Sequence, residues 1–242
     1  MNEEKAEIGS HLKGFKEKIK QGEYEENEEI KIPMFNRLCD RYDNSGIVMP
    51  QEQFDMYRVI TKSIKETGRY ALKKTVCDVG CGLGIGSNIL SQEAKFVWGI
   101  DKNKKTIGFA KQMYSRDYQP QVTFDEVDIT DFKREPMKFD MIVAIELIEH
   151  VKDYKKAMDF IKRLCKPNSV VYISSPNRNA PTIDDSKPKN KYHVREWTAA
   201  EFYDVMINNF KVVMLYKWDL SEDVDLDTKY TPLLVECREI IQ

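Results

Sequence analysis

Apolar and polar residues alternate along most of this chain in blocks that predict strands and helices in turn. Short apolar runs typical of buried strands occupy 74–79, 96–100, 121–127, 139–145 and 169–174. Apolar residues at helical spacing fall over 85–94, 103–115, 153–165 and 198–209. Strands that alternate with helices predict an α/β fold with a mostly parallel sheet and helices on both faces.

The C-terminal part of the chain departs from this alternation. Lys211–Trp218 and Pro232–Cys237 are two apolar runs joined by an acidic loop, with no helix between them. We therefore expect an antiparallel terminal hairpin at the sheet edge, which brings the predicted sheet to seven strands. Nucleotide-dependent dehydrogenases lack this feature.

The N-terminal part predicts helices without strands. Pro50 precedes a helical pattern over 51–66, and a shorter amphipathic helix is indicated further upstream by Ile8, Leu12, Phe15 and Ile19. A solvated, partly frayed extension is the alternative for the first thirty residues. We expect a helical N-terminal extension or cap over 1–70 and one α/β domain over 71–242.

The segment Val76–Ser87, VCDVGCGLGIGS, carries the most specific signal in the chain. An apolar run ends in Asp78, and glycines follow at 80, 82, 84 and 86. Such glycines let the backbone turn sharply and let a ligand approach main-chain N–H groups. A dinucleotide fingerprint that begins at Gly80 would need glycine at 85, which is Ile85 here. The pattern is instead acidic-x-Gly-x-Gly-x-Gly.

Acidic residues follow the next two strands. Asp101 comes 19 residues after Gly82, where a carboxylate can accept the hydrogen bonds of a ribose diol. Asp128 and Ile129 follow the third strand. Each of these acids alone is an ordinary strand-end residue, but their order and spacing together predict a nucleotide-type cofactor site.

This combination resembles the class I S-adenosylmethionine (SAM) dependent methyltransferases over roughly residues 70–237. The resemblance implies a Rossmann-like fold with SAM over the glycine loop. It places the methionine end near Asp78 and Gly80, the ribose on Asp101, and the adenine by Asp128 and Ile129. The other residues that we expect to line the cofactor are Cys81, Gly82, Gly84, Lys102 and Glu146.

A second constellation follows the fourth strand. Glu146, Glu149 and His150 are spaced i, i+3 and i+4, so a helical turn would place them on one face. Two carboxylates and an imidazole can act as a general base or ligate a cation. The string ExxEHV resembles ubiquinone-biosynthesis O-methyltransferases and related sugar and small-molecule enzymes. It also resembles small-RNA 3′-end 2′-O-methyltransferases, in which these residues and a later histidine hold a divalent metal.

His193, in the segment HVREWT, falls at the position of that later histidine. The RNA-end family has His-x-Phe-Glu-Trp-Thr there; Val194 and Arg195 replace the aromatic context, and the family's additional upstream histidines are missing. The resemblance implies ligands for Mg²⁺, Mn²⁺ or Zn²⁺ at Glu146, Glu149, His150 and His193. The alternative is a metal-free site in which His150 or His193 is the general base, so the catalytic candidates are His150, His193 and Glu146.

The stretch 176–192 has three prolines and no periodicity, and in this fold it overhangs the acceptor pocket. It holds more basic than acidic side chains, namely Arg178, Lys187, Lys189 and Lys191 against Asp184 and Asp185. Such a lid suits a phosphorylated, carboxylated or nucleotide acceptor, and a solvated loop is the alternative.

Composition narrows the partners. The chain has 242 residues with a net charge of −2, so it has no polyanion-binding signature and nothing that indicates DNA. Its five cysteines form no CxxC pair, which is typical of reduced thiols in a cytoplasmic protein. No apolar run predicts a leader or a membrane segment.

We therefore expect a SAM-dependent methyltransferase (EC 2.1.1) that methylates a hydroxyl group of a small molecule or glycan. One alternative is a metal-dependent 2′-O-methyltransferase that acts on RNA 3′ ends. The other is a SAM-binding protein without catalysis.

Overall fold

The computed structural model describes residues 51–66, 74–115, 121–180, 190, 192–217, 220 and 223–241. The chain forms two compact units, Met1–Phe54 and Asp55–Gln242, and the second holds the sheet and the candidate site. The helix expected around Ile8 to Ile19 lies outside the described residues. The division of the chain at residue 70 stays a prediction.

The described elements follow the predicted alternation of strands and helices. The helix expected over 51–66 is α3 (Gln51–Glu66). The others, in chain order, are β1 (Thr75–Val79), α4 (Ile85–Ser91), β2 (Phe96–Asp101), α5 (Lys104–Tyr114), β3 (Val122–Glu126), β4 (Phe139–Ala144), η1 (Ile148–His150), α6 (Tyr154–Leu164), β5 (Cys165–Ser175), α7 (Ala199–Ile207), β6 (Phe210–Lys217) and β7 (Leu233–Ile240).

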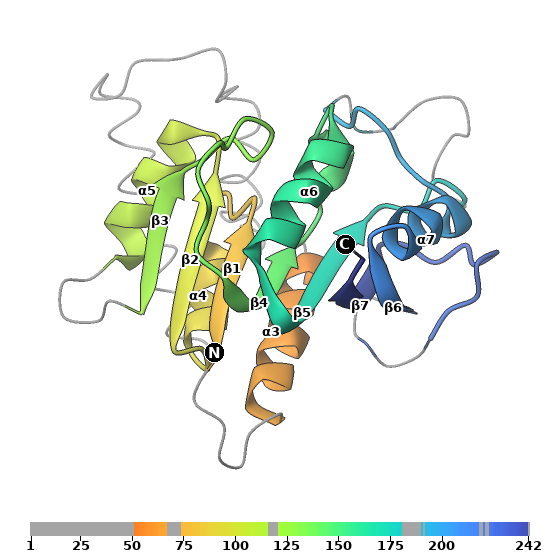
Figure 1. The fold of residues 1–242 in the computed structure, drawn as a ribbon, viewed down its shortest axis with the longest axis horizontal. Helices are drawn as coiled ribbons and strands as arrows, with labels where there is room; N and C mark the ends of the chain where they lie inside the picture. The colour runs from red at the N-terminus through yellow and green to blue at the C-terminus, as the bar shows by residue number, and fades with distance from the viewer. Residues whose placement is uncertain are drawn as a thin grey trace. The chain divides into compact units, whose positions relative to one another are not determined.

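The seven strands form one sheet in the order β3-β2-β1-β4-β5-β7-β6 (Figure 1). β1 pairs in parallel with both β2 and β4, and β3 and β5 extend this parallel array on either side. β7 runs antiparallel to β5 and to β6. The predicted fold class is confirmed: a Rossmann-like, mostly parallel seven-stranded sheet with an antiparallel terminal hairpin.

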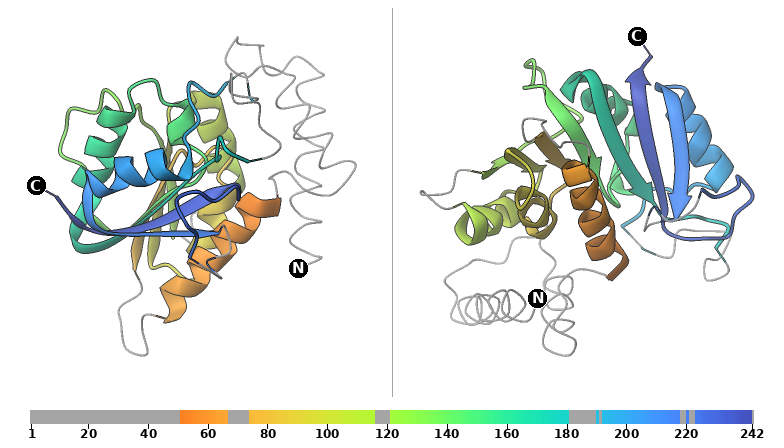
Figure 2. Two further views of the ribbon diagram at one scale, coloured as in Figure 1. Left: turned by 90° about the vertical axis from the view of Figure 1, so that its right-hand side faces the viewer. Right: turned by 90° about the horizontal axis from the view of Figure 1, so that it is seen from below.

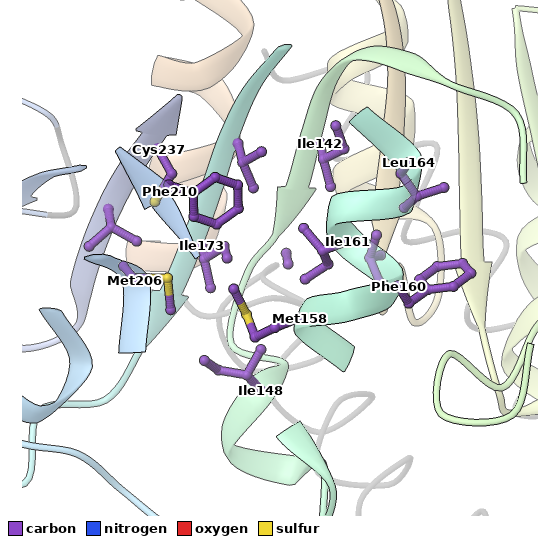
Figure 3. Close-up of a cluster of buried hydrophobic side chains, with 14 of the residues drawn as sticks. Ile142, Ile148, Met158, Phe160, Ile161, Leu164, Ile173, Met206, Phe210 and Cys237 are labelled. Atoms are coloured by element: carbon purple, nitrogen blue, oxygen red, sulfur yellow. The ribbon is translucent and has the colours of Figure 1, made fainter. Parts of the chain in front are cut away.

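Helices cover both faces of this sheet. Figure 2 shows α4 and α5 on the same face as α3, with α6 and α7 on the opposite face. The apolar cluster beneath α6 and α7 includes Met158 and Ile161 of α6 and Met206 of α7, which lie against Ile142 and Ile173 of the sheet (Figure 3). Strands that are covered on both faces consist of consecutive apolar residues, so their positions could be predicted from the sequence.

The largest shift from the predicted boundaries is at the junction of α6 and β5. α6 ends at Leu164, and β5 begins at Cys165 rather than at residue 169. Pro167 cannot continue a helix. The Ser169 hydroxyl accepts a hydrogen bond from Lys166 N at 2.7 Å and donates one to Phe139 O at 2.5 Å, which ties this early segment to β4.

The sheet topology decides where a site can form. β1 lies between β2 and β4, so the chain order reverses there, and crevices at such points bind ligands at the carboxyl ends of the strands. The glycine loop follows β1, and Glu146 to His150 follow β4. These two segments therefore meet at one edge of the sheet. Among the described residues, no helix combines the length and the apolar character needed to cross a bilayer.

Candidate active site

The glycine loop has a left-handed backbone at three positions. Gly80, Gly82 and Gly84 have φ of 77°, 52° and 82°. A side chain at Gly84 would lie 2.8 Å from Ala110 and 2.9 Å from Phe124, whereas one at Gly82 would meet nothing within 4 Å. Gly84 thus serves close packing, while the backbone at Gly82 borders open space in which a ligand can approach it.

Asp101 lies directly against this loop. Its Oδ2 accepts a hydrogen bond from Gly82 N at 3.1 Å, and its Oδ1 accepts one from Asn103 N at 2.8 Å. Each carboxylate oxygen can accept a further bond, so both can reach the two hydroxyls of a ribose. Burial raises the pKa of Asp101, while the two backbone N–H groups act in the opposite direction. The predicted spacing therefore brings Asp101 to the glycine loop.

Asp78 is fully buried and is engaged from within the protein. Its carboxylate accepts hydrogen bonds from the Tyr57 hydroxyl at 2.9 Å and the Ser87 hydroxyl at 2.6 Å. Burial raises the pKa of Asp78 to about 6. Burial also raises the pKa of the neighbouring Cys81 thiol, which therefore stays protonated. Direct contact of either side chain with the cofactor stays a prediction.

The predicted adenine-side residues follow β3 next to Asp101. Val127 N donates a hydrogen bond to Asp101 O at 2.9 Å, which joins the ends of β2 and β3. Asp128 is exposed, and the hydroxyl and backbone N–H of Thr130 lower its pKa. Ile129 is half-buried against the core, and Lys102 is exposed. These positions suit a base stacked on Ile129, with Asp128 at its edge.

Glu146 departs from the predicted helical face. Only Ile148–His150 form a 3₁₀ turn, and Glu146 precedes it with a φ of 50°. The Ser174 hydroxyl accepts a hydrogen bond from Glu146 N and donates one to Glu146 Oε1, both at 2.8 Å. These two bonds to β5 hold Glu146 in a left-handed conformation, so the expected i, i+3, i+4 arrangement on one helix is wrong.

Glu149, His150 and His193 do converge. One ligand atom from each lies within 4.8 Å of the others. The two imidazole rings are 4.7 Å apart and meet edge to face. Val194 N donates a hydrogen bond to Glu149 O at 2.8 Å, which joins the segment after β5 to the turn after β4. Three of the four expected metal-ligating residues are therefore together, and Glu146 is outside this group.

The Glu149 carboxylate is fully buried, and neither of its oxygens has a hydrogen-bond partner among the described residues. Burial raises its pKa well above the usual range, and the charge of Glu146 adds to this, while its own backbone N–H and the nearby Ser175 hydroxyl, which is itself buried and unpartnered, act in the opposite direction. Buried polar groups are normally hydrogen-bonded. An unpartnered carboxylate beside two imidazoles therefore indicates a site for a proton, a substrate group or a cation.

Hydrogen bonds select the tautomers of both histidines. His150 Nδ1 lies 3.1 Å from the carbonyl of Tyr192, which can only accept, so Nδ1 carries the proton. His193 Nδ1 lies 2.5 Å from Glu196 Oε1, which fixes the same tautomer. Burial lowers the pKa of His150. His150 therefore presents an unprotonated Nε2 near neutral pH, as a general base or a metal ligand requires.

The residues present suit a divalent cation. Imidazole nitrogens and a carboxylate are ligands that Mn²⁺ and Zn²⁺ accept, and water can complete the shell. The Nε2 atom of His193 lies 3.0 Å from the Asn190 side-chain nitrogen, which an ion bound there would displace. The carboxylate behind His193 is the partner that usually orients a metal-bound histidine. Glu149, His150 and His193 would hold such an ion, and it would supply a positive charge beside an acceptor oxygen.

Several residues of this region had not been singled out from the sequence. Glu196, Ser174 and Tyr57 hold His193, Glu146 and Asp78, respectively. The contact of Glu196 with His193 could have been predicted, because a carboxylate three residues after a histidine can reach its imidazole ring. Tyr57 and Ser174 had no such signal, since their partners are distant in the sequence.

The expected lid over 176–192 lies largely outside the described residues. The described residues at the start of this stretch hold it against the rest of the domain. Asn177 is fully buried, and its side-chain amide donates to the carbonyls of Thr228 and Tyr230, both at 2.8 Å. Arg178 forms a two-pronged ion pair with Glu201 at 2.7 and 2.8 Å, so its guanidinium already has a carboxylate partner within the protein. The covering role of this stretch stays a prediction.

Comparisons with known proteins agree with this geometry. The profile of a methyltransferase domain family matches residues 72–230. The ubiquinone biosynthesis O-methyltransferase of Paraburkholderia phymatum is 36% identical over 107 residues, which cover 44% of this chain and 46% of that protein. The chain spans about half the length of the curated relatives it matches.

Solved structures share the fold. The N-methyltransferase NodS of Bradyrhizobium japonicum, in complex with S-adenosyl-l-homocysteine, superimposes with a TM-score of 0.59 at 18% identity, over 86% of this chain and 96% of that one. The small RNA methyltransferase HEN1 gives a TM-score of 0.61 at 20% identity, over 76% of this chain and 24% of that one. With the glycine loop and Asp101 in place on this fold, and a family match across most of the sheet, the chain belongs to the methyltransferase domain family.

Proposed function

We propose that this methyltransferase acts on a hydroxyl group of a small molecule or glycan. The observation that carries the proposal is the Glu149–His150–His193 cluster, in which a buried carboxylate without hydrogen-bond partners adjoins two oriented imidazoles. A hydroxyl acceptor must lose its proton as it is methylated, and this cluster can remove it. The named relatives in ubiquinone biosynthesis are O-methyltransferases, which supports the same chemistry.

The residues of the chain divide this task between them. Bound SAM supplies an electrophilic methyl group at its sulfonium. Asp101 and the backbone of the glycine loop would hold the ribose and the adjoining part of SAM. Most of the rate acceleration would then come from placing the acceptor in line with the methyl group. His150 would take the acceptor proton at Nε2, because its Nδ1–H is held by the Tyr192 carbonyl. Glu149 would stabilise the imidazolium that results.

The second candidate is a metal-assisted 2′-O-methyltransferase that acts on an RNA 3′ end. It is favoured by the convergence of Glu149, His150 and His193 and by the orphaned Glu149 carboxylate. A cation on these three residues would lower the pKa of an acceptor hydroxyl and so replace the general base. The partial match of HVREWT to the RNA-end family supports the same candidate.

Labelled methyl transfer from SAM tests both proposals at once. The purified chain would be incubated with fractionated metabolites, glycans and single-stranded RNA, with and without EDTA. Binding of S-adenosylhomocysteine, measured in parallel, serves as the control that the cofactor site is intact. Transfer to a small molecule or glycan that persists in EDTA supports the first proposal, and EDTA-sensitive transfer to RNA supports the second. Transfer to an amine alone would overturn both.

A metal titration adds a direct measurement. If the three residues bind Mn²⁺, its affinity should fall as the pH is lowered, because protons compete first for Glu149, whose pKa is raised, and at lower pH for the His150 imidazole. His193→Ala should abolish binding of the ion while SAM affinity stays the same. In the metal-free case no ion binds, and His150→Ala should reduce the rate by roughly 10²–10⁴-fold as a lost general base.

A further inference from the structure

A buried hydrogen-bond network joins α3 to the strand that opens the glycine loop. The Tyr57 hydroxyl of α3 donates to Asp78 Oδ1 at 2.9 Å, and the Ser87 hydroxyl of α4 donates to Oδ2 at 2.6 Å. Tyr57 is 3% exposed, and both Asp78 and Ser87 are fully buried. Each oxygen of this carboxylate is therefore held by a different helix.

The position of the Tyr57 ring depends on a glycine. A side-chain carbon at Gly86 would lie 2.2 Å from Tyr57 Cζ, closer than atoms can approach. Gly86 lies within α4, where glycine costs about 1 kcal/mol relative to alanine. The helix therefore has a less favourable residue at a position where any side chain would collide with the Tyr57 ring. The glycine therefore indicates that α4 accommodates the Tyr57 ring at one defined position, which general apolar packing would not require.

We propose that Tyr57 is a positioning residue for SAM, because it keeps the Asp78 carboxylate ionised and oriented behind the glycine loop. Asp78 is two residues before Gly80, and family resemblance places it near the methionine end of SAM, which carries an ammonium and a sulfonium. Since Asp78 is fully buried, its charge acts on these cations through a low-dielectric interior, where charges interact strongly over several ångströms. α3 thereby contributes to cofactor affinity without contacting the cofactor.

The charges around Asp78 are consistent with this role. Burial raises its pKa to about 6, the Ser87 and Tyr57 hydroxyls lower it, and the charge of Asp101 raises it. Burial and the Asp78 charge raise the pKa of Tyr57, which therefore remains a donor. Burial likewise keeps the thiols of Cys77 and Cys81 neutral. Loss of the Tyr57 hydroxyl would raise the pKa of Asp78 further, toward neutral pH, and so reduce the fraction of the carboxyl that is ionised.

The test is the pH dependence of SAM affinity in Tyr57→Phe, measured by calorimetry on the full chain. If the hydroxyl accounts for about one pKa unit of Asp78, the variant should bind SAM about twofold more weakly near pH 7 and about tenfold more weakly near pH 5, where the ionised fraction of Asp78 falls in proportion. The difference should shrink as the pH rises and the carboxylate ionises again. In the background of Asp78→Asn, which has no charge to preserve, Tyr57→Phe should cause no further loss.

Tyr172→Phe is the matched control. Tyr172 is also 3% exposed, and its hydroxyl donates to the Glu236 carboxylate at 3.0 Å, but it lies on β5 and outside the glycine loop. The Tyr172→Phe variant should be less stable than the wild type, but it should bind SAM with wild-type affinity at every pH. Gly86→Ala displaces the Tyr57 ring, so it should weaken SAM binding in the same way as Tyr57→Phe. It therefore tests the proposal even if Tyr57→Phe does not fold. Wild-type affinity in both Tyr57→Phe and Gly86→Ala, or an equal loss in Tyr172→Phe, would overturn the proposal.

Discussion

Replacement of Glu149 by methionine should stabilise the protein while it removes methyl transfer. Glu149 is fully buried and its carboxylate oxygens have no hydrogen-bond partner. A buried polar group without partners costs about 1–3 kcal/mol, and more when it is charged. Methionine has a similar length, is apolar and adapts its shape to the space available. We therefore expect the free energy of unfolding to rise by about 2 kcal/mol at neutral pH.

For a chain of this size, 1 kcal/mol shifts the melting temperature by about 2–4 °C, so the expected rise is about 4–8 °C. The effect should depend on pH. Burial raises the pKa of Glu149 above its value in the unfolded chain, so the folded state holds the proton more tightly. The wild-type free energy of unfolding should therefore fall as the pH rises from about 4.3 toward the raised pKa. The Glu149→Met variant should lack this part of the pH dependence.

Differential scanning calorimetry of the metal-free protein measures the shift, and Glu236→Met is the matched control. Glu236 is another buried carboxylate, but it accepts hydrogen bonds from Tyr172 at 3.0 Å and Arg238 at 2.8 Å. Its replacement should therefore lower the melting temperature. A lower melting temperature in Glu149→Met would show that the native carboxylate is stabilised, and would refute the reasoning. Added Mn²⁺ should stabilise only the wild type if the cluster binds a cation.

Three further outcomes follow from the site. Asp101→Asn removes the charge and places an NH₂ group toward one of the two backbone N–H donors, so calorimetry should show SAM affinity reduced by about 30–150-fold, or roughly 2–3 kcal/mol. Asp125→Asn, on the neighbouring strand, should bind SAM normally. Gly82→Val should abolish SAM binding, because a branched side chain would fill the open space at this left-handed position, and retained binding would contradict the assigned cofactor position. Glu196→Gln should lower methyl transfer about tenfold and leave SAM affinity unchanged, because an amide is uncharged and can offer either its oxygen or its NH₂ group to His193 Nδ1, so the tautomer is no longer fixed. An altered ¹⁵N spectrum of His193 would separate this from a structural effect.

Local patterns were enough to predict the fold. The strands are covered on both faces, so they appear as apolar runs whose length and spacing show in the sequence alone. The Gly82 to Asp101 spacing was also sufficient, because a strand–loop–helix–strand unit of fixed length brings its two loops to one edge of a parallel sheet. The Thr198–Glu201 capping box at the start of α7 is a contact of the same local kind, because its two partners are three residues apart.

Contacts between distant segments decided the second half of the site. Spacing within Glu146 to His150 indicated one helical face, but Ser174 on β5 holds Glu146 in a left-handed turn instead. His193 lies beside His150 because the segment around it is bonded to the turn after β4, through Val194 N to Glu149 O and the Tyr192 carbonyl to His150 Nδ1. Likewise, the burial of Glu149 and the bond from Tyr57 to Asp78 depend on elements that meet only in the folded chain. Periodicity determines which face of an element is apolar, whereas the partners of a buried polar group are set by tertiary packing, since that packing decides which oxygens lose water and which donors replace it.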